Sequence, residues 1–402
     1  LNNDLSLLNA PYLLKGMETA VDKIFEAIGR KNKICVYGDY DVDGITSTAV
    51  MIRTLRKLGA DAVYYIPNRI EEGYGLNAVS MDRIKELGVN LIITVDCGIR
   101  SNDAVDYARS LGMEVVITDH HECEGELPKA HSILNPHQPD CGYPFKDLAG
   151  VGVAFKLSSA LLSKADNASC AEELLDIVSL GTIADIVPLL GENRIIVKHG
   201  LNRMGNTDNK GIKALLRVCG LYRRELTTYN VAFMLAPRIN AAGRIANATE
   251  CVELLLTDNE DRAMEIAAKL NSDNLERQAI ENRILNDAIA IIEGTSDLDK
   301  DKVLVLCDKD WHIGVIGIVA SRLAERFYLP TFIMSREGEL CKGSARSIPG
   351  FNIFEAMSKY DFLFERYGGH EMAAGFTIHA DRVGELRECM NRETERVFGI
   401  DK

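Results

Sequence analysis

KICVYGDYDVDG, residues 33–44, joins an apolar run of strand character directly to a turn that carries three aspartates. Three further apolar runs follow along the chain, at 61–67, 90–95 and 114–118, with stretches of helical character at 44–58, 76–87 and 101–110. Near-continuous apolar strands that alternate with helices are typical of a parallel sheet covered by helices on both faces. The sequence therefore predicts a doubly wound α/β domain.

The chain of 402 residues is long enough for a second domain. Residues 150–256 are predicted to be mainly helical, and the stretch 258–293 has no Gly or Pro and places apolar residues at helical spacing. From residue 302 a second pattern begins, with strands expected at 302–307 and 331–335 and helices at 314–326 and 383–397. We expect a catalytic domain at 1–257, a long connecting helix at 258–293 and a smaller α/β domain at 294–402, with a cleft between the two lobes.

The overall composition is that of a globular protein, with 47% hydrophobic and 26% charged residues. No apolar run approaches the length that a membrane span needs, and we expect no secretory signal. The ten cysteines include no CxxC pair, which favours reduced thiols and a cytoplasmic location. The net charge of −13 argues, taken alone, against a nucleic-acid partner, although a local groove of cations can coexist with an acidic exterior.

Carboxylates and histidines gather in four short clusters, three of which directly follow predicted strands: Asp39, Asp41 and Asp43; Asp96; His120 and His121; and Asp185. In doubly wound sheets, ligands bind beyond the carboxyl ends of the strands. Carboxylates that are brought together there repel one another and resist desolvation. A mixture of carboxylate and imidazole ligands suits divalent ions such as Mn²⁺ or Mg²⁺. The sequence therefore predicts a metal-dependent hydrolase.

Each cluster also has a simpler interpretation. The three aspartates at 39–43 alternate, so in an extended segment they would point the same way, but they could also form a solvated acidic turn. Asp96 alone could be a helix cap, and Asp185, in an apolar helical run, could pair with an arginine. Two adjacent histidines are expected to face different ways, so that one binds a metal and the other addresses substrate or orients a ligand, unless both are held by ordinary hydrogen bonds.

Two ions that share these ligands would lie about 3.5–4 Å apart and would activate a water for attack on phosphorus. No GxSxG motif for a serine nucleophile is present. Hydrolysis without a covalent intermediate is therefore the expected reaction.

The second half of the chain supplies residues that could bind a phosphate or a base. The candidates are Arg238, Asn240, Arg244, Ser344, Arg346, Gly369 and His370 for phosphate, and Trp311 for stacking on a base. The alternatives are ordinary polar turns and, for Trp311, a packed core aromatic.

Several of these segments resemble the motifs of a known superfamily. YGDYDVDG, VDCG, TDHH and GTIAD resemble the four motifs of the DHH phosphoesterases, and GGHEMAAGF resembles the glycine-rich histidine motif of the DHH-associated domain. PRINAAGR and WHIGVIGIVASRL are similar to the RecJ family of single-strand-specific DNA exonucleases. The resemblance covers about residues 5–376. It implies hydrolysis of single-stranded DNA from the 5′ end to 5′-mononucleotides, in recombination and repair, with Mn²⁺ or Mg²⁺.

Carried over by position, the resemblance implies metal ligands at Asp39, Asp41, Asp43, Asp96, His120 and Asp185. It gives catalytic roles to Asp96, His120, His121 and Asp185, with His121 either holding the scissile phosphate or tuning the site. The superfamily commonly has a histidine four positions before the second acidic residue; here Tyr37 stands at that place, and Asp39 would compensate. Which of the three aspartates at 39–43 lies outside the first coordination shell stays open.

The resemblance also implies partners beyond the DNA strand, namely a single-strand-binding protein and a helicase. RecJ proteins generally continue into an oligonucleotide-binding barrel, which this sequence lacks, so we expect the chain to hold long single strands poorly. Two alternatives stay open: a DHH enzyme that acts on oligoribonucleotides, bisphosphate nucleotides or cyclic dinucleotides, and a non-catalytic scaffold of the same fold.

Overall fold

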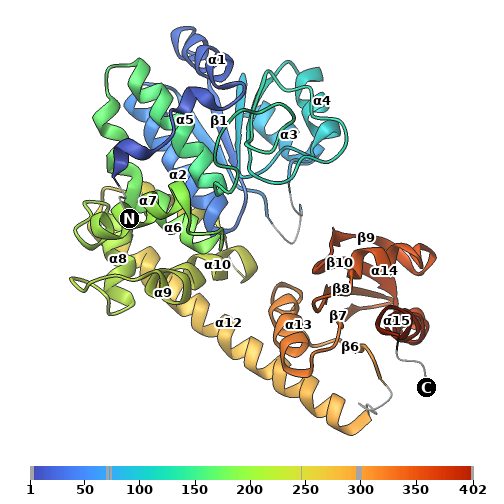
Figure 1. Ribbon diagram of the computed structural model, residues 1–402. Helices are drawn as coiled ribbons and strands as arrows, with labels where there is room; N and C mark the ends of the chain where they lie inside the picture. Colours follow the sequence, from blue (N-terminus) through green and yellow to red (C-terminus); the bar gives the residue numbers. More distant parts are fainter. Residues whose placement is uncertain (1–3, 69–71, 73–74, 246, 296–300, 400–402) are drawn as a thin grey trace. The chain divides into compact units, whose positions relative to one another are not determined.

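The structure is a computed structural model that describes residues 4–68, 72, 75–245, 247–295 and 301–399 (Figure 1). The chain divides into two compact units, Leu1–Asn274 and Leu275–Lys402. The division falls inside one long helix. Each unit has its own core and is described by itself.

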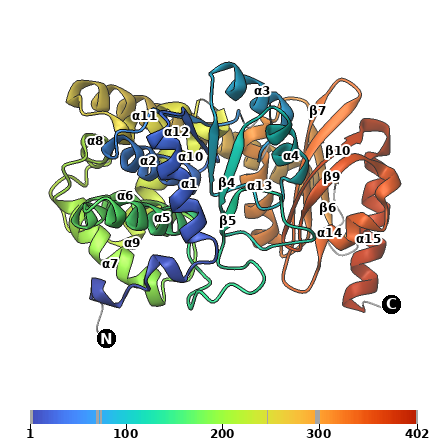
Figure 2. The same cartoon turned by 90° about the horizontal axis from the view of Figure 1, so that it is seen from above.

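The first unit is built on a five-stranded sheet in the order β2-β1-β3-β4-β5, and every neighbouring pair is parallel. The strands are β1 (Ile34–Gly38), β2 (Ala62–Tyr65), β3 (Leu91–Val95), β4 (Glu114–Thr118) and β5 (Ser132–Leu134). Helices α1 (Met17–Gly29), α2 (Val42–Lys57) and α5 (Gly150–Lys164) lie on one face, and α3 (Ala78–Glu86) and α4 (Asn102–Ser110) on the other (Figure 2). This confirms the predicted doubly wound sheet. The short edge strand β5 was not predicted, because three residues between polar loops show no periodic pattern.

A helical layer completes the first unit beside α2. It consists of α6 (Leu175–Ala184), α7 (Gly191–Gly205), α8 (Lys210–Val218), α9 (Thr228–Asn230), a π-helical turn (Val231–Leu235), α10 (Ala236–Ile245) and α11 (Thr249–Leu256). Short 3-10 helices lie at Leu5–Leu7, Pro11–Leu13 and Ala168–Leu174. Helices α5 and α6 pack directly on α2, which brings the end of α6 to the start of α2.

The long helix α12 spans Glu260–Thr295 and has 36 residues. At about 1.5 Å per residue it is about 54 Å long. Its first turns bury Ala263, Ile266 and Leu270 in the core of the first unit, and its later turns bury Ile284 and Ile292. An apolar stripe without an internal proline lets one helix continue through the boundary between the units.

The second unit contains a mixed sheet in the order β6-β7-β8-β10-β9. Its elements are β6 (Leu304–Asp308), α13 (Ile313–Phe327), β7 (Thr331–Glu337), β8 (Leu340–Arg346), α14 (Ile353–Ser358), β9 (Phe364–His370), β10 (Ala373–His379) and α15 (Val383–Phe398), with a 3-10 helix at Asp361–Leu363 and another at Ala380–Arg382. Strands β6 and β7 are parallel, and the other pairs are antiparallel.

The sequence analysis expected polar turns or anion-binding loops around Ser344 and Arg346 and around Gly369 and His370. These segments are instead parts of strands β8 and β9, which pair with β10. Glycine weakens the strand pattern there, but Gly343 and Gly369 have packing roles that the sequence does not reveal. A Cβ on Gly343 of β8 would lie 2.2 Å from the ring of Phe376 on β10, so the glycine is what makes room for that ring. Within the described ranges, no helix has the length and apolar character to cross a bilayer.

Candidate metal centre

The three aspartates of the acidic turn lie where the chain passes from strand β1 into helix α2. Asp39 follows the last residue of β1, Asp41 is the N-cap of α2, and Asp43 lies in the first turn of that helix. The Asp41 carboxylate accepts the Gly44 N–H at 3.0 Å, as N-cap side chains do. The expected extended alternation is therefore wrong, because the helix begins at Val42.

Asp43 is 1% exposed and is fixed by backbone donors from another helix. The amides of Gly150 and Val151, at the N-terminus of α5, donate to its two carboxylate oxygens at 2.6 and 2.9 Å. A helix N-terminus stabilises a carboxylate through its unpaired N–H groups and its dipole. These two residues were missed by the sequence analysis; the run of small residues at 149–152, which opens an apolar stretch, was the available signal.

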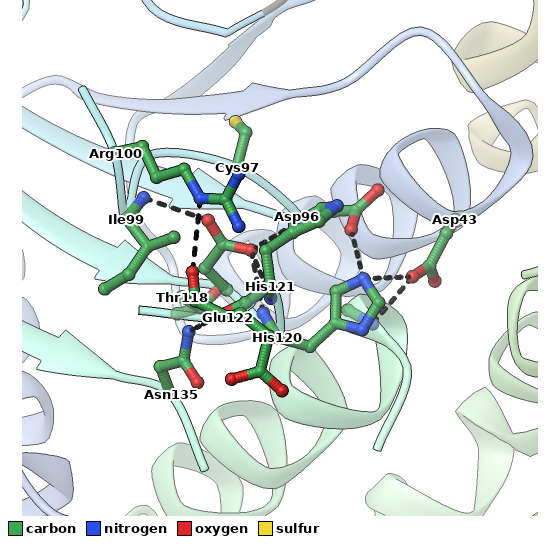
Figure 3. Close-up of polar contacts among 12 residues, drawn as sticks. Asp43, Asp96, Cys97, Ile99, Arg100, Thr118, His120, His121, Glu122 and Asn135 are labelled. Carbon is green, nitrogen blue, oxygen red and sulfur yellow. Dashed lines mark hydrogen bonds and ion pairs between the residues drawn. The ribbon is translucent and has the colours of Figure 1, made fainter. Parts of the chain in front are cut away.

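Asp96 follows β3 in a left-handed backbone conformation with φ +59°. Aspartate is among the few residues that adopt this region, at a cost of about 1 kcal/mol. The side chain is 3% exposed, and its Oδ1 lies 3.1 Å from Nε2 of His120 (Figure 3). The strained backbone at Asp96 thus coincides with a carboxylate that points into the cluster.

His120 lies at the centre of carboxylates that come from three different elements. Its Nε2 is 3.8 Å from Oδ2 of Asp43 and 3.8 Å from Oδ2 of Asp185, in addition to its contact with Asp96. Asp185 is the C-cap of α6, so the packing of α6 on α2 delivers it. Residues that are far apart in the sequence therefore meet at one point.

His121 is oriented by Asp119, which belongs to the same cluster in the sequence but was given no role of its own there. Nδ1 of His121 lies 2.7 Å from Oδ1 of Asp119. That carboxylate also accepts the backbone N–H groups of Ile99, His120 and His121, at 2.9, 2.8 and 3.1 Å. Asn135 donates to the His121 carbonyl at 2.8 Å, and this buried amide was also missed (Figure 3).

The two histidine rings do not diverge as expected. Their centroids are 4.5 Å apart with an interplanar angle of 56°, and a nitrogen of each lies within 4.8 Å of an Asp96 oxygen. The Asp119 carboxylate behind His121 sets the orientation of that ring, and it also holds the backbone N–H of His120.

The electrostatics of the cluster call for a positive charge. Burial, together with the neighbouring carboxylates, raises the pKa values of Asp43, Asp96 and Asp185. Burial also lowers the pKa of His120 to about 4, so this imidazole is neutral at physiological pH and cannot neutralise them. Oδ1 of Asp96 and Oδ2 of Asp185 are buried and accept no hydrogen bond from the described residues.

The donor set fits a divalent cation. Three overlapping groups each bring their ligand atoms within 4.8 Å of one another: Asp43, His120 and Asp185; Asp39, Asp41 and Asp96; and Asp96, His120 and His121. Carboxylate oxygens with one or two imidazole nitrogens are ligands that Mn²⁺ and Mg²⁺ accept. The phenol of Tyr37 takes no part in this set, because its hydroxyl donates to the Gly75 carbonyl at 2.9 Å.

The candidates on α10 belong to the same unit as the acidic cluster. Arg238 donates through Nε to Oδ1 of Asn271 at 3.0 Å and through Nη1 to the Met234 carbonyl. Asn240 and Arg244 are partly buried on the same helix. A Cβ on Gly243 would lie 2.6 Å from the carbonyl oxygen of Tyr40, so α10 packs against the acidic turn itself.

The remaining candidates lie in the second unit. Arg346 on β8 donates to Oγ of Ser344 at 2.8 Å and to Oγ of Ser321 at 3.1 Å, so the arginine is held in place by hydroxyls. Gly369 and the exposed His370 lie on β9, and not on a loop. Trp311 is only 3% exposed and has no free face for a base; the packed-aromatic alternative is correct, and base stacking by this residue is wrong.

The raised pKa values of the aspartates predict an unusual pH dependence of the metal-free protein. A carboxylate whose folded pKa exceeds its unfolded value of about 3.9 stabilises the folded state while it is protonated, and this stability is lost as the pH rises. We therefore expect the free energy of unfolding in EDTA to fall between about pH 6.5 and about pH 8, and Mn²⁺ to restore it most at the higher pH. Urea unfolding at both pH values measures this; a stability in EDTA that increases with pH and does not respond to Mn²⁺ would contradict it.

Comparison with known families assigns both units. Residues 33–182 match the DHH family, N-terminal domain, and residues 300–396 match the DHHA1 domain. The single-stranded-DNA-specific exonuclease RecJ of Bacillus subtilis is 46% identical over 383 residues, which are 95% of this chain and 48% of that protein. The protein of the same name from Escherichia coli is 40% identical over 400 residues, with 93% and 69% covered. The chain thus spans about half the length of the first relative and about two thirds of the second.

Two solved structures match nearly the whole length of the chain. The crystal structure of exonuclease RecJ bound to manganese matches with a TM-score of 0.86 at 35% identity and covers 98% of this chain and 97% of that chain. RecJ of Thermus thermophilus in complex with Mn²⁺ matches with a TM-score of 0.84 at 34% identity, over 98% of this chain and 56% of that chain.

Proposed function

Since the chain belongs to the DHH family and, within it, to RecJ, we propose that it hydrolyses single-stranded DNA from the 5′ end to 5′-mononucleotides in recombination and repair. The observation that carries the proposal is the convergence of Asp43, Asp96 and Asp185 on His120 in a buried cluster. Burying carboxylates without a counter-charge costs desolvation free energy. The presence of these carboxylates in the cluster therefore indicates a bound cation. We propose two divalent ions, Mn²⁺ or Mg²⁺, held by the six predicted ligands Asp39, Asp41, Asp43, Asp96, His120 and Asp185.

The ions would supply an activated water and would offset the negative charge of the phosphate. The protein's own contribution is to hold the ligands in position before they bind. Asp43 cannot swing away, because two backbone amides of α5 fix both of its oxygens. His120 stays neutral because burial lowers its pKa, which leaves a ring nitrogen able to act as a ligand.

His121 has a different role in the proposal, as a donor to the scissile phosphate. Burial alone would lower the pKa of His121, but its hydrogen bond and charge interaction with Asp119 raise it. A protonated imidazole beside the cluster can donate to a phosphate oxygen and can supply a proton to the leaving oxygen. The residues Arg238, Asn240, Arg244, Ser344, Arg346, Gly369 and His370 are proposed to contact the strand, and partnership with a single-strand-binding protein or a helicase stays a prediction.

A substrate comparison with Mn²⁺ separates this function from those of other DHH enzymes. We expect single-stranded DNA to be cleaved with a kcat/KM at least tenfold above that for a short RNA or a cyclic dinucleotide. A 5′-labelled strand should release labelled mononucleotide first, and a 3′-labelled strand should release it last. Preferential turnover of the cyclic dinucleotide, or release from the 3′ end, would overturn the proposal.

A further inference from the structure

One segment of this acidic chain has the opposite charge. Residues 194–224 contain eight Lys and Arg side chains and a single carboxylate, Asp208, whereas the whole chain has a net charge of −13. The segment covers most of α7, all of α8 and the turn that follows α8 (Figure 1). A local excess of cations on an acidic protein creates a local positive potential, which attracts an anionic partner at short range.

Helix α7 presents part of this charge as a row on its exposed face. Arg194, Lys198 and Asn202 are all exposed and are spaced four residues apart, so they follow one another along one side of the helix. The opposite side is apolar, with Ile195, Ile196 and Val197 buried in the unit's core. The row is therefore a fixed feature of the helix surface.

The row leads to a hollow of about 480 Å³ between the end of α7 and the turn after α8. Lys198, Asn202, Arg223, Arg224 and Leu226 are among the residues that line it, together with one carboxylate, that of Glu225, so the lining carries three cations and one anion. Within the part of the chain that the structure describes, Arg194, Lys198, Arg223 and Arg224 form no ion pair with a carboxylate. Cations that are exposed, clustered and not neutralised by the protein fit phosphate groups.

The position of α7 connects this surface with the proposed active site. Helix α7 begins six residues after Asp185, and α6 and α7 pack against each other. The two helices run in opposite directions, because Gly200 of α7 lies against Ser179 and Leu175 near the start of α6. Helix α7 therefore leads away from the metal centre over its 15 residues, about 22 Å, and the row from Arg194 to Asn202 occupies about 12 Å of that length. A stacked single strand would cover the length of α7 with about six nucleotides.

Two exposed aromatic rings follow the hollow in the chain. Tyr229 and Phe233 are 63% and 66% exposed, and their ring centroids are 4.8 Å apart. Tyr229 comes three residues after Leu226, so at most about 11 Å separates their Cα atoms. Large apolar rings that remain in water beside unpaired cations are the combination that single-stranded nucleic acids bind, since bases stack on the rings while phosphates contact the cations.

We propose that the exposed face of α7, the hollow at its end and the Tyr229–Phe233 pair form a second binding surface for single-stranded DNA, away from the metal centre. The identity of the strand rests on the proposed function, but the surface itself does not require catalysis. It would hold the part of the substrate several nucleotides from the cleaved bond. A chain with this surface would bind strands longer than about six nucleotides more tightly than the metal centre alone allows.

The test is binding without divalent ions, measured by fluorescence anisotropy of a labelled dT12 in EDTA. The triple variant Lys198→Ala, Arg223→Ala, Arg224→Ala should raise the Kd at least tenfold and should reduce the slope of log K against log salt by about 2, since each lost phosphate contact removes about 0.7. The variant Tyr229→Ala, Phe233→Ala should raise the Kd about tenfold with an unchanged salt slope, because stacking does not release ions.

The matched control removes three exposed lysines at the amino ends of the sheet strands, Lys31→Ala, Lys85→Ala and Lys129→Ala, and should change the Kd less than twofold. A triple variant that binds dT12 as tightly as this control, or a wild-type protein that binds a duplex of the same length equally well, would overturn the proposal. Cleavage is assayed separately with Mn²⁺. If the wild type cleaves no DNA yet the binding losses are seen, the proposed function fails and the surface stands.

Discussion

Replacing Asp96 with Asn is expected to reduce DNA cleavage by at least three orders of magnitude and to leave the metal-free protein folded. The amide keeps the shape of the side chain and tolerates the left-handed backbone at this position, φ +59°. It removes one negative charge from a cluster whose members raise each other's pKa, so we expect the variant in EDTA to be at least as stable as the wild type near neutral pH. The variant should also lose most of the stabilisation that Mn²⁺ gives to the wild type, about 2.7 kcal/mol at a metal concentration of 100 Kd.

Asp140 provides a matched control for this substitution. It is an exposed aspartate with nearly the same backbone conformation, φ +59°, and it belongs to none of the candidate metal groups. Asp140→Asn should keep full cleavage and the full Mn²⁺ response in a thermal melt. An Asp96→Asn enzyme that cleaves within tenfold of the wild type would show that Asp96 is not a ligand of a required ion.

Replacing Gly150 with Ala is expected to reduce cleavage about 100-fold or more, although the residue contributes no side chain to the site. An added Cβ would lie 2.5 Å from Oδ1 and 2.8 Å from Cβ of Asp96, while the amide of the same residue holds Asp43. The methyl group must therefore displace Asp96 or shift the backbone amide that holds Asp43. Displacements of about 1 Å at a reacting centre cost rates of this order, and overpacking costs about 1–3 kcal/mol of stability.

Gly152 lies two residues further along the same helix. The control substitution Gly152→Ala therefore distinguishes an effect on the site from an effect on the helix. The three atoms nearest to a Cβ there would all belong to the Leu148 side chain, the nearest at 3.2 Å. Because alanine is the better helix former, Gly152→Ala should change the free energy of unfolding by less than about 1 kcal/mol and should keep cleavage. Equal losses of kcat in the two variants would indicate a general effect on α5 and would contradict the role given to Gly150.

The fold of the first unit could be predicted because its signals are local. Apolar runs such as 91–95 are buried on both faces of the sheet, and an aspartate directly after the run marks the carboxyl end of the strand. The second unit was harder to predict. Strands β8 and β9 contain glycines and polar residues whose strand state depends on the neighbouring strands, as Gly343 depends on the ring of Phe376.

In the site, too, only the features that depend on the local sequence could be predicted. The six predicted ligands carry their chemistry in their own side chains, and the structure brings their atoms together. The residues that hold them in place act through backbone amides or second contacts: Gly150 and Val151 on Asp43, and Asp119 and Asn135 on His121. The contacts of Gly150 and Val151 with Asp43 arise only when distant segments meet, so no pattern within one segment predicts them. Asp119 lies two residues before His121 in the same motif, but its residue type alone does not reveal that it anchors that ring. Trp311 was assigned to substrate because of its residue type, and only its burial reveals that it is a core residue.

The most direct test of the central claim is an anomalous difference map from crystals soaked in Mn²⁺, recorded at the manganese absorption edge. The account predicts strong peaks among Asp43, Asp96, His120 and Asp185, and their loss in crystals of Asp96→Asn. Absence of any peak in this cluster, from an enzyme that still cleaves DNA in the same Mn²⁺ solution, would contradict it.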